Sequence, residues 1–136
     1  MKALLLDANV LVRFLVQDDP KQSAAATALL MKAERREVTL HLDVLTVAEV
    51  VYVLMGRYGR NRMEVVSVLL AVIQNAGMET FEKDTVTAAL QRFGAFNVDF
   101  SDAWLAARAA HSGRAVASFD RDFDKFKDIK RVEPTS

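Results

Sequence analysis

The sequence contains no cysteine and only two histidines, His41 and His111. The lack of cysteine excludes thiol catalysis, thiolate zinc sites and a disulfide framework. Because two histidines are too few for a histidine-rich zinc site, any metal would be a hard cation bound by oxygen ligands. The lack of a glycine-rich phosphate loop argues against an NTPase or a dinucleotide-dependent enzyme.

The sequence also lacks net charge and long apolar runs. Its 18 basic and 18 acidic residues cancel, so a polyanion partner would need a local basic patch. No basic-then-apolar signal segment opens the sequence, and no run approaches the ~18 apolar residues of a membrane span. These absences predict a soluble, cytoplasmic protein without a membrane partner.

The 136 residues, of which 51% are hydrophobic, are enough for one domain with its own core, and we predict a single domain over 1–136. Short apolar strands at 4–6, 38–42 and 115–119 alternate with helical patterns. This alternation predicts an α/β fold, a three-layer α/β/α sandwich with a mostly parallel central sheet. The strand ending at Leu6 is expected to be buried and to deliver Asp7 to the carboxyl edge of the sheet.

Several helix limits follow from capping residues and apolar spacing. Asp19 before Pro20 and Asn61 are expected N-caps, and Thr46 with Glu49 matches the capping-box spacing. The inner faces of three helices are predicted to be Val10, Phe14 and Leu15; Val47, Val50, Val51 and Leu54; and Met63, Val66, Leu70 and Ile73.

Four acidic residues fall near strand ends or at the starts of the helices that follow: Asp7, Glu49, Asp102 and Asp120. In a parallel sheet all four can converge on one edge, where their repulsion would need a cation to offset it. Each one taken singly is more typical of a helix cap or first turn than of a metal ligand. The pattern by itself leaves both interpretations open. Carboxylates without histidine or thiolate suit Mg²⁺ or Mn²⁺, and paired ions of this kind support phosphodiester hydrolysis.

Four segments together resemble the successive motifs of PIN domains, in particular those of the VapC-type toxins of toxin–antitoxin pairs. The segments are Leu4–Leu11 (LLLDANVL), Thr46–Val50 (TVAEV), Phe100–Ala107 (FSDAWLAA) and Ser118–Phe123 (SFDRDF). No single motif is specific for this family. The four motifs in this order and at these separations are specific for it.

The resemblance implies a metal-dependent endoribonuclease that hydrolyses RNA phosphodiester bonds with Mg²⁺ or Mn²⁺. It places Asp7, Glu49, Asp102 and Asp120 on the acidic quartet that holds the metal, with Asn9, Thr46, Ser118 and Asp122 as supporting residues. Whether Asp122 joins the metal site stays open. The resemblance also implies a homodimer and a cognate antitoxin protein as partner.

Basic residues offer a few candidate RNA contacts. Arg57, Arg60 and Arg62 either grip phosphates or form a solvated turn between two helices. Arg13 either contacts a phosphate or pairs with Asp18 or Asp19. The basic residues of the C-terminal part alternate with acidic ones and are expected to be solvated: Lys125, Lys127, Lys130 and Arg131.

Two alternatives to a nuclease remain at this point. One is a non-catalytic PIN-fold scaffold in RNA processing. The other is a receiver-like Mg²⁺-binding signalling domain, although no paired acids follow the first strand.

Overall fold

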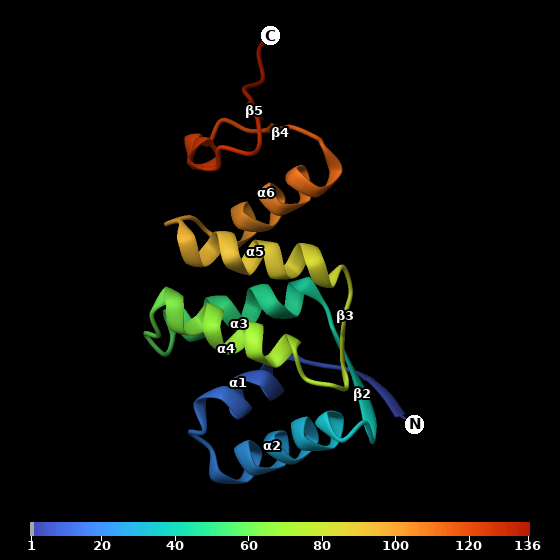
Figure 1. The fold of residues 1–136 in the computed structure, drawn as a ribbon. Helices are drawn as coiled ribbons and strands as arrows, with labels where there is room; N and C mark the ends of the chain where they lie inside the picture. The colour runs from blue at the N-terminus through green and yellow to red at the C-terminus, as the bar shows by residue number, and fades with distance from the viewer. Residues whose placement is uncertain (1) are drawn as a thin grey trace. The chain divides into compact units, whose positions relative to one another are not determined.

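The computed structural model describes residues 2–136 and arranges them as alternating short strands and helices (Figure 1). The chain divides into two compact units, Met1–Lys83 and Asp84–Ser136. No helix in the described part of the chain is long and apolar enough to cross a membrane.

The first unit is built on a parallel sheet of three strands in the order β1-β2-β3. The strands are β1 (Lys2–Leu5), β2 (Val38–Leu42) and β3 (Met78–Thr80). Leu4 pairs with Leu40, and Leu40 pairs with Met78, so the carboxyl ends of all three strands lie at one edge. The predicted α/β class, the parallel pairing and the strand at 38–42 are confirmed.

The prediction that the first strand is buried is wrong. Residues Lys2–Leu5 are all exposed, and the Leu5 side chain is 88% exposed. In the three-stranded sheet β1 lies at one side and pairs only with β2, whereas β2 is flanked on both sides. The middle strand is therefore the buried one, and Leu40 in it is fully covered. Leu6, just after β1, is the first buried residue among those the structure describes.

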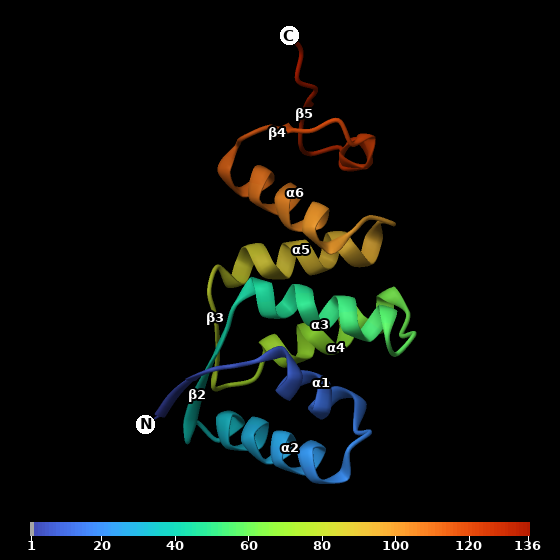
Figure 2. The ribbon, with the colours of Figure 1, turned by 180° about the vertical axis from the view of Figure 1, so that it is seen from behind.

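Four helices complete this unit: α1 (Ala8–Val16), α2 (Pro20–Glu34), α3 (Val44–Gly56) and α4 (Arg62–Ile73). In both ribbon views α1 and α2 lie side by side, and α1 also packs against α3 (Figures 1 and 2). The expected caps Asp19 and Asn61 are confirmed. The capping box at Thr46 is wrong, because α3 begins earlier and its N-cap is Asp43, whose carboxylate accepts from the Leu45 amide.

The core of this unit follows the predicted apolar spacing most closely in α3. All four of its predicted residues, Val47, Val50, Val51 and Leu54, are buried. The other two faces are shifted around their helices. In α1 the buried residues are Ala8, Leu11 and Val12, and in α4 they are Val65, Val66, Leu69, Val72 and Ile73. Met63 is 64% exposed. Two of the residues predicted for the inner face of α4, Val66 and Ile73, are nevertheless buried.

The second unit contains α5 (Lys83–Ala95), α6 (Phe100–Ser112), β4 (Val116–Ala117), the 3₁₀ helix η1 (Arg121–Lys125) and β5 (Arg131–Val132). The two strands pair in parallel, and Gly113 ends α6 with a φ of 71°. Phe96 of the α5–α6 loop contacts Phe126, with ring centroids 5.0 Å apart, and Phe93 contacts Phe100 at 5.9 Å. These aromatic pairs fix α6 and the segment after η1 to α5.

Candidate metal centre

Asp102 stands in the first turn of α6. Its backbone N–H donates to the carbonyl of Asp99 (3.1 Å), which occupies the N-cap position. The Asp102 carboxyl is half-buried, and this burial raises its pKa. The negative charges of Asp120, Asp99 and Asp122 raise the same pKa further. The Asp102 carboxylate is therefore short of compensating positive charge.

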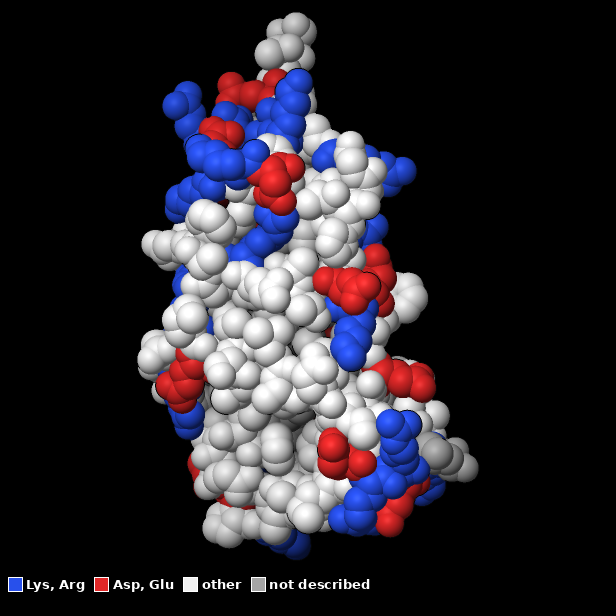
Figure 3. All heavy atoms as spheres, in the orientation of Figure 1, with Lys and Arg blue, Asp and Glu red and all other residues white. Residues whose placement is uncertain are grey.

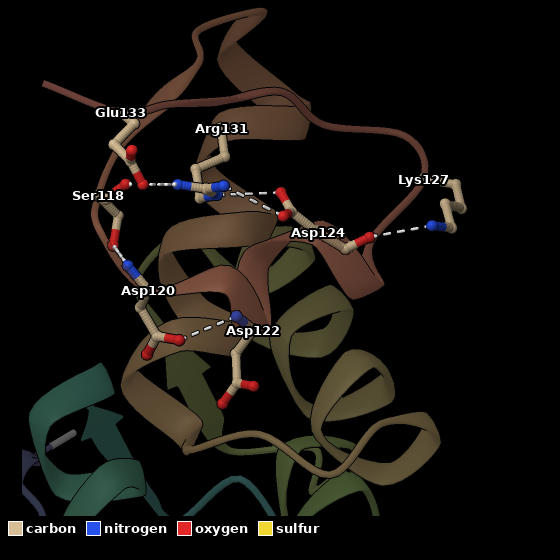
Figure 4. A network of polar contacts seen from close by, with 7 residues as sticks. All are labelled: Ser118, Asp120, Asp122, Asp124, Lys127, Arg131 and Glu133. Atoms are coloured by element: carbon tan, nitrogen blue, oxygen red, sulfur yellow. Dashed lines mark hydrogen bonds and ion pairs between the residues drawn. The ribbon is translucent and has the colours of Figure 1, made fainter.

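Asp120 and Asp122 lie on the short segment that follows β4. The Asp120 amide donates to the hydroxyl of Ser118 (2.9 Å), and the Asp122 amide donates to the Asp120 carboxylate (2.8 Å). Figure 4 shows this sequence of contacts along the segment. Because each turn residue binds the next, the Asp120 side chain has a fixed direction, and it also serves as the N-cap of η1.

The structure brings Asp102, Asp120 and Asp122 together. Each offers a carboxylate oxygen, and these oxygens lie within 4.8 Å of one another. Lys125, three residues after Asp122, pairs with it at 3.2 Å and compensates part of the negative charge. The three side chains offer only hard oxygen donors, and the raised pKa of Asp102 reflects first its burial and then the negative charge of its neighbours. The donor set therefore suits Mg²⁺ or Mn²⁺.

Asp7, Asn9, Thr46 and Glu49 belong to the first unit. Asp7 directly follows Leu6 and caps α1, with its carboxylate accepting from the Asn9 amide (3.2 Å). The Thr46 hydroxyl donates to the Leu6 carbonyl (3.4 Å), which ties the start of α3 to the end of the first strand. The side chains of Asp7, Asn9 and Glu49 are exposed. Asp7 thus lies at the carboxyl edge of the sheet, as predicted.

The four predicted acids are thus divided between the two units. Asp7 and Glu49 stand in the first unit, and Asp102 and Asp120 stand in the second. Within the second unit, Asp122 joins the other two acids, a point that the motifs left open. The local signal for Asp122 is its place two residues after Asp120, where the backbone amide of a turn reaches the preceding carboxylate.

Arg13 is engaged by a carboxylate of its own unit. Its guanidinium pairs with Asp18, and Asp18 also accepts from the Tyr58 hydroxyl (2.9 Å). The hydrogen bonds from Tyr58 and Arg13 hold the pKa of Asp18 below its usual range. Of the two interpretations of Arg13, the structure supports the ion pair, and the Tyr58 hydroxyl takes part in the same contact.

The basic turn between α3 and α4 is partly neutralised. Arg60 pairs with Glu64 at 2.8 Å, one helical turn further on. The Arg57 guanidinium lies over the Tyr58 ring, 5.8 Å from its centroid. Arg57 is exposed, and Arg60 and Arg62 are half-buried. The turn keeps more positive than negative side chains at the surface.

The prediction that the basic residues near the C-terminus are solvated is wrong for Arg131. Charged side chains of both signs do alternate over the surface formed by η1 and β5 (Figure 3). The Arg131 side chain, however, is only 13% exposed and forms ion pairs with Asp124 and Glu133. The alternation of basic and acidic residues does not reveal this difference. The sequence alone does not show which basic side chain becomes buried when β4 pairs with β5.

The comparisons with known proteins were decisive only at the level of the family. No curated protein matches the chain at a significant level. Residues 4–129 match the family model of the PIN domain. This match takes in residues of both units, including Asp7, Glu49, Asp102, Asp120 and Asp122, and it agrees with the parallel α/β fold. The chain therefore belongs to the PIN domain family.

Proposed function

We propose that this protein is an endoribonuclease that hydrolyses RNA phosphodiester bonds with the help of Mg²⁺ or Mn²⁺. PIN domains are in general metal-dependent nucleases, and the chain belongs to that family. The observation that carries the proposal is the group formed by Asp102, Asp120 and Asp122, whose carboxylate oxygens lie within 4.8 Å of one another. Membership of the PIN family favours a PIN nuclease over the receiver-like alternative, which has no support from the comparisons.

In the proposed reaction Asp102, Asp120 and Asp7 are the main ligands of the cation, and Glu49 is either a ligand or orients the attacking water. When bound, Mg²⁺ or Mn²⁺ would activate a water molecule and stabilise the leaving oxygen. Ser118 keeps the Asp120 backbone in place, and the Asp122 amide orients the Asp120 carboxylate. Asn9 and Thr46 support Asp7 from the start of α1 and α3.

The proposed biological role is that of a toxin in a type II toxin–antitoxin system. Its support is the likeness of the four motifs to those of VapC-type toxins. On this proposal the protein is cytoplasmic, acts as a homodimer on RNA and is held inactive by a cognate antitoxin. The family match covers both units, which supports a single functional domain over 1–136. Arg57, Arg60 and Arg62 are the proposed RNA contacts.

The proposal is tested with the substitution Asp7→Asn. Asparagine caps helices about as well as aspartate, so the start of α1 is expected to survive while the carboxylate is lost. Asp19→Asn is a matched control, because Asp19 caps α2 in the same way, accepting from the Gln22 amide at 3.0 Å, and is not a proposed ligand. Total RNA is incubated with each purified protein in Mn²⁺ and in EDTA.

We expect the unsubstituted protein and Asp19→Asn to cleave RNA in Mn²⁺ and not in EDTA. A folded Asp7→Asn variant should not cleave RNA in either solution. Cleavage by Asp7→Asn at the unsubstituted rate contradicts the proposed metal ligands. Calorimetric titration of the unsubstituted protein with Mn²⁺ adds a second readout. Failure to bind Mn²⁺ at all would instead favour the non-catalytic scaffold.

A further inference from the structure

Arg131 makes more directed contacts than any surface role requires. It lies on β5, its side chain is 13% exposed, and its guanidinium donates to both oxygens of Asp124 at 3.0 and 3.2 Å. The same group donates to the carbonyl of Ser118 (3.0 Å) and to Glu133 (3.1 Å). A two-pronged contact of this kind fixes direction as well as distance.

The two main partners of Arg131 lie on either side of the acidic residues of the proposed metal centre. Ser118 precedes Asp120, and Asp124 follows Asp122, so Arg131 holds both ends of the segment 118–124 (Figure 4). The pairing of β4 with β5 brings Arg131 to this segment, since the Ser118 amide donates to the Val132 carbonyl (3.1 Å).

Between its two ends the segment is connected by hydrogen bonds of its own. Ser118 accepts from the Asp120 amide, and Asp120 accepts from the Asp122 amide. Movement of Ser118 would therefore pass to Asp120 and then to Asp122. A guanidinium that fixes Ser118 and Asp124 therefore also constrains the Asp120 carboxylate and the backbone of Asp122 between them.

We propose that Arg131 is a positioning residue of the metal centre, which holds Asp120 and Asp122 in the arrangement that binds the divalent cation. This inference rests on the proposed function, because it assigns a task to a residue that touches neither the cation nor the RNA. Residues that orient the ligands of a metal typically contribute about 10- to 100-fold to its affinity.

The sign of the effect separates positioning from simple electrostatics. Arg131 is a positive charge close to a site for a cation, so its removal should strengthen Mn²⁺ binding if only charge matters. If Arg131 holds the ligands in place, the same removal weakens binding. The substitution Arg131→Lys keeps the charge but not the two-pronged contact, so positioning predicts an intermediate loss and electrostatics predicts no change.

The experiment measures Mn²⁺ affinity by calorimetry for the full chain and for Arg131→Met, Arg131→Lys and Arg92→Met. Arg92 is the matched control, since its side chain is 16% exposed and pairs through two nitrogens with Asp128 in the same unit, outside the segment 118–124. Hydrogen exchange of the segment 118–124 in EDTA gives a readout that needs no metal. Circular dichroism checks the fold of each variant.

We expect Arg131→Met to weaken Mn²⁺ binding about 10-fold or more and to speed exchange in the segment, with a smaller loss for Arg131→Lys. Arg92→Met should stay within about 2-fold of the unsubstituted affinity, since its contact does not reach the segment. Equal or tighter binding by a folded Arg131→Met variant overturns the inference, and so does an equal loss in Arg92→Met. If Arg131→Met does not fold, Asp124→Asn decides in its place, because it removes the same ion pair from the other side. If the unsubstituted protein binds no Mn²⁺, the proposed function itself fails and this inference fails with it.

Discussion

The substitution Asp102→Asn should have opposite effects on stability without and with a metal. Asp102 faces two other carboxylates at the proposed centre, and their oxygens lie within 4.8 Å of one another. Asparagine removes the charge and keeps the shape of the side chain. Without a cation the substitution relieves repulsion, and with a cation it removes a ligand.

The size of the first effect follows from Coulomb's law. Two unit charges 4.8 Å apart repel by about 0.9 kcal/mol in water and by about 3.5 kcal/mol at an effective dielectric constant of 20. Because Asp120 is exposed and Lys125 compensates Asp122, the lower end applies to each pair, about 1 to 2 kcal/mol in total. A charge lost from the first turn of α6 costs about 0.3 to 1 kcal/mol. The net expectation is a gain of about 1 kcal/mol, or roughly 4 °C in Tm.

The gain should depend on pH in a defined direction. Burial, with the neighbouring carboxylates, raises the pKa of Asp102 in the folded state. A raised carboxyl pKa favours folding fully below the unfolded pKa of about 3.9, and this contribution is lost as pH rises through the folded pKa. The unsubstituted protein is therefore penalised at pH 7. The difference between it and Asp102→Asn should shrink as pH falls through the folded pKa and vanish below about 3.9, where Asp102 is neutral in the folded and the unfolded state.

Calorimetric unfolding in EDTA and in Mn²⁺ measures both effects. Mn²⁺ at 100 times its dissociation constant stabilises a binding protein by about 2.7 kcal/mol, which exceeds the gain in the variant. The order of the two melting temperatures should therefore reverse when Mn²⁺ is added. Asp84→Asn is the control, since Asp84 also lies in a helical first turn but outside the group of acids. Lower stability of Asp102→Asn than of the unsubstituted protein in EDTA at pH 7 would refute the reasoning.

Two further predictions concern stability alone. A Cβ at Gly77 would lie 2.2 Å from the Ala33 carbonyl oxygen and 2.7 Å from that of Val38, so Gly77→Ala should cost about 1 to 3 kcal/mol in urea unfolding. An unchanged unfolding free energy would show that this close approach relaxes freely. The hydrogen bond from Arg92 lowers the pKa of Asp128. The ion pair therefore stabilises the fold fully above the unfolded pKa of about 3.9, and this stabilisation is lost as pH falls through the folded pKa. Asp128 is 57% exposed, so Asp128→Asn should cost about 0.2 to 1 kcal/mol at pH 7 and nothing at low pH, and equal losses at both would contradict the assignment.

The elements that the sequence predicted best are those governed by local chemistry. The caps Asp19 and Asn61 were identified because short polar side chains satisfy the free amides at a helix start. The buried face of α3 was identified because its apolar residues recur at helical spacing. Both signals act within a few residues, and tertiary contacts did not override them.

The errors on the first strand and on Arg131 concern properties that depend on distant parts of the chain. The run of leucines before Asp7 predicted a buried strand, but burial depends on which strands flank it, and β1 has β2 on one side only in its sheet. Arg131 resembled its solvated neighbours because its cover comes from the β4–β5 pairing and from Asp124. Sequence reasoning also could not decide on Asp122, whose place depends on the start of α6 as much as on its own turn.

The choice between cap and metal ligand, which the sequence posed for each acid, does not have to be made. Asp120 is the N-cap of η1, and it uses one carboxylate oxygen to accept from the Asp122 amide. A carboxylate has two oxygens with about four acceptor positions, so this bond leaves capacity for a cation. Capping also holds the side chain in one direction, which a metal ligand needs. Asp7 makes the same kind of capping hydrogen bond, because one of its carboxylate oxygens accepts from the Asn9 amide at the start of α1. A helix start at the edge of a sheet can therefore present a carboxylate to a cation, and the caps at Asp7 and Asp120 are compatible with the proposed metal site.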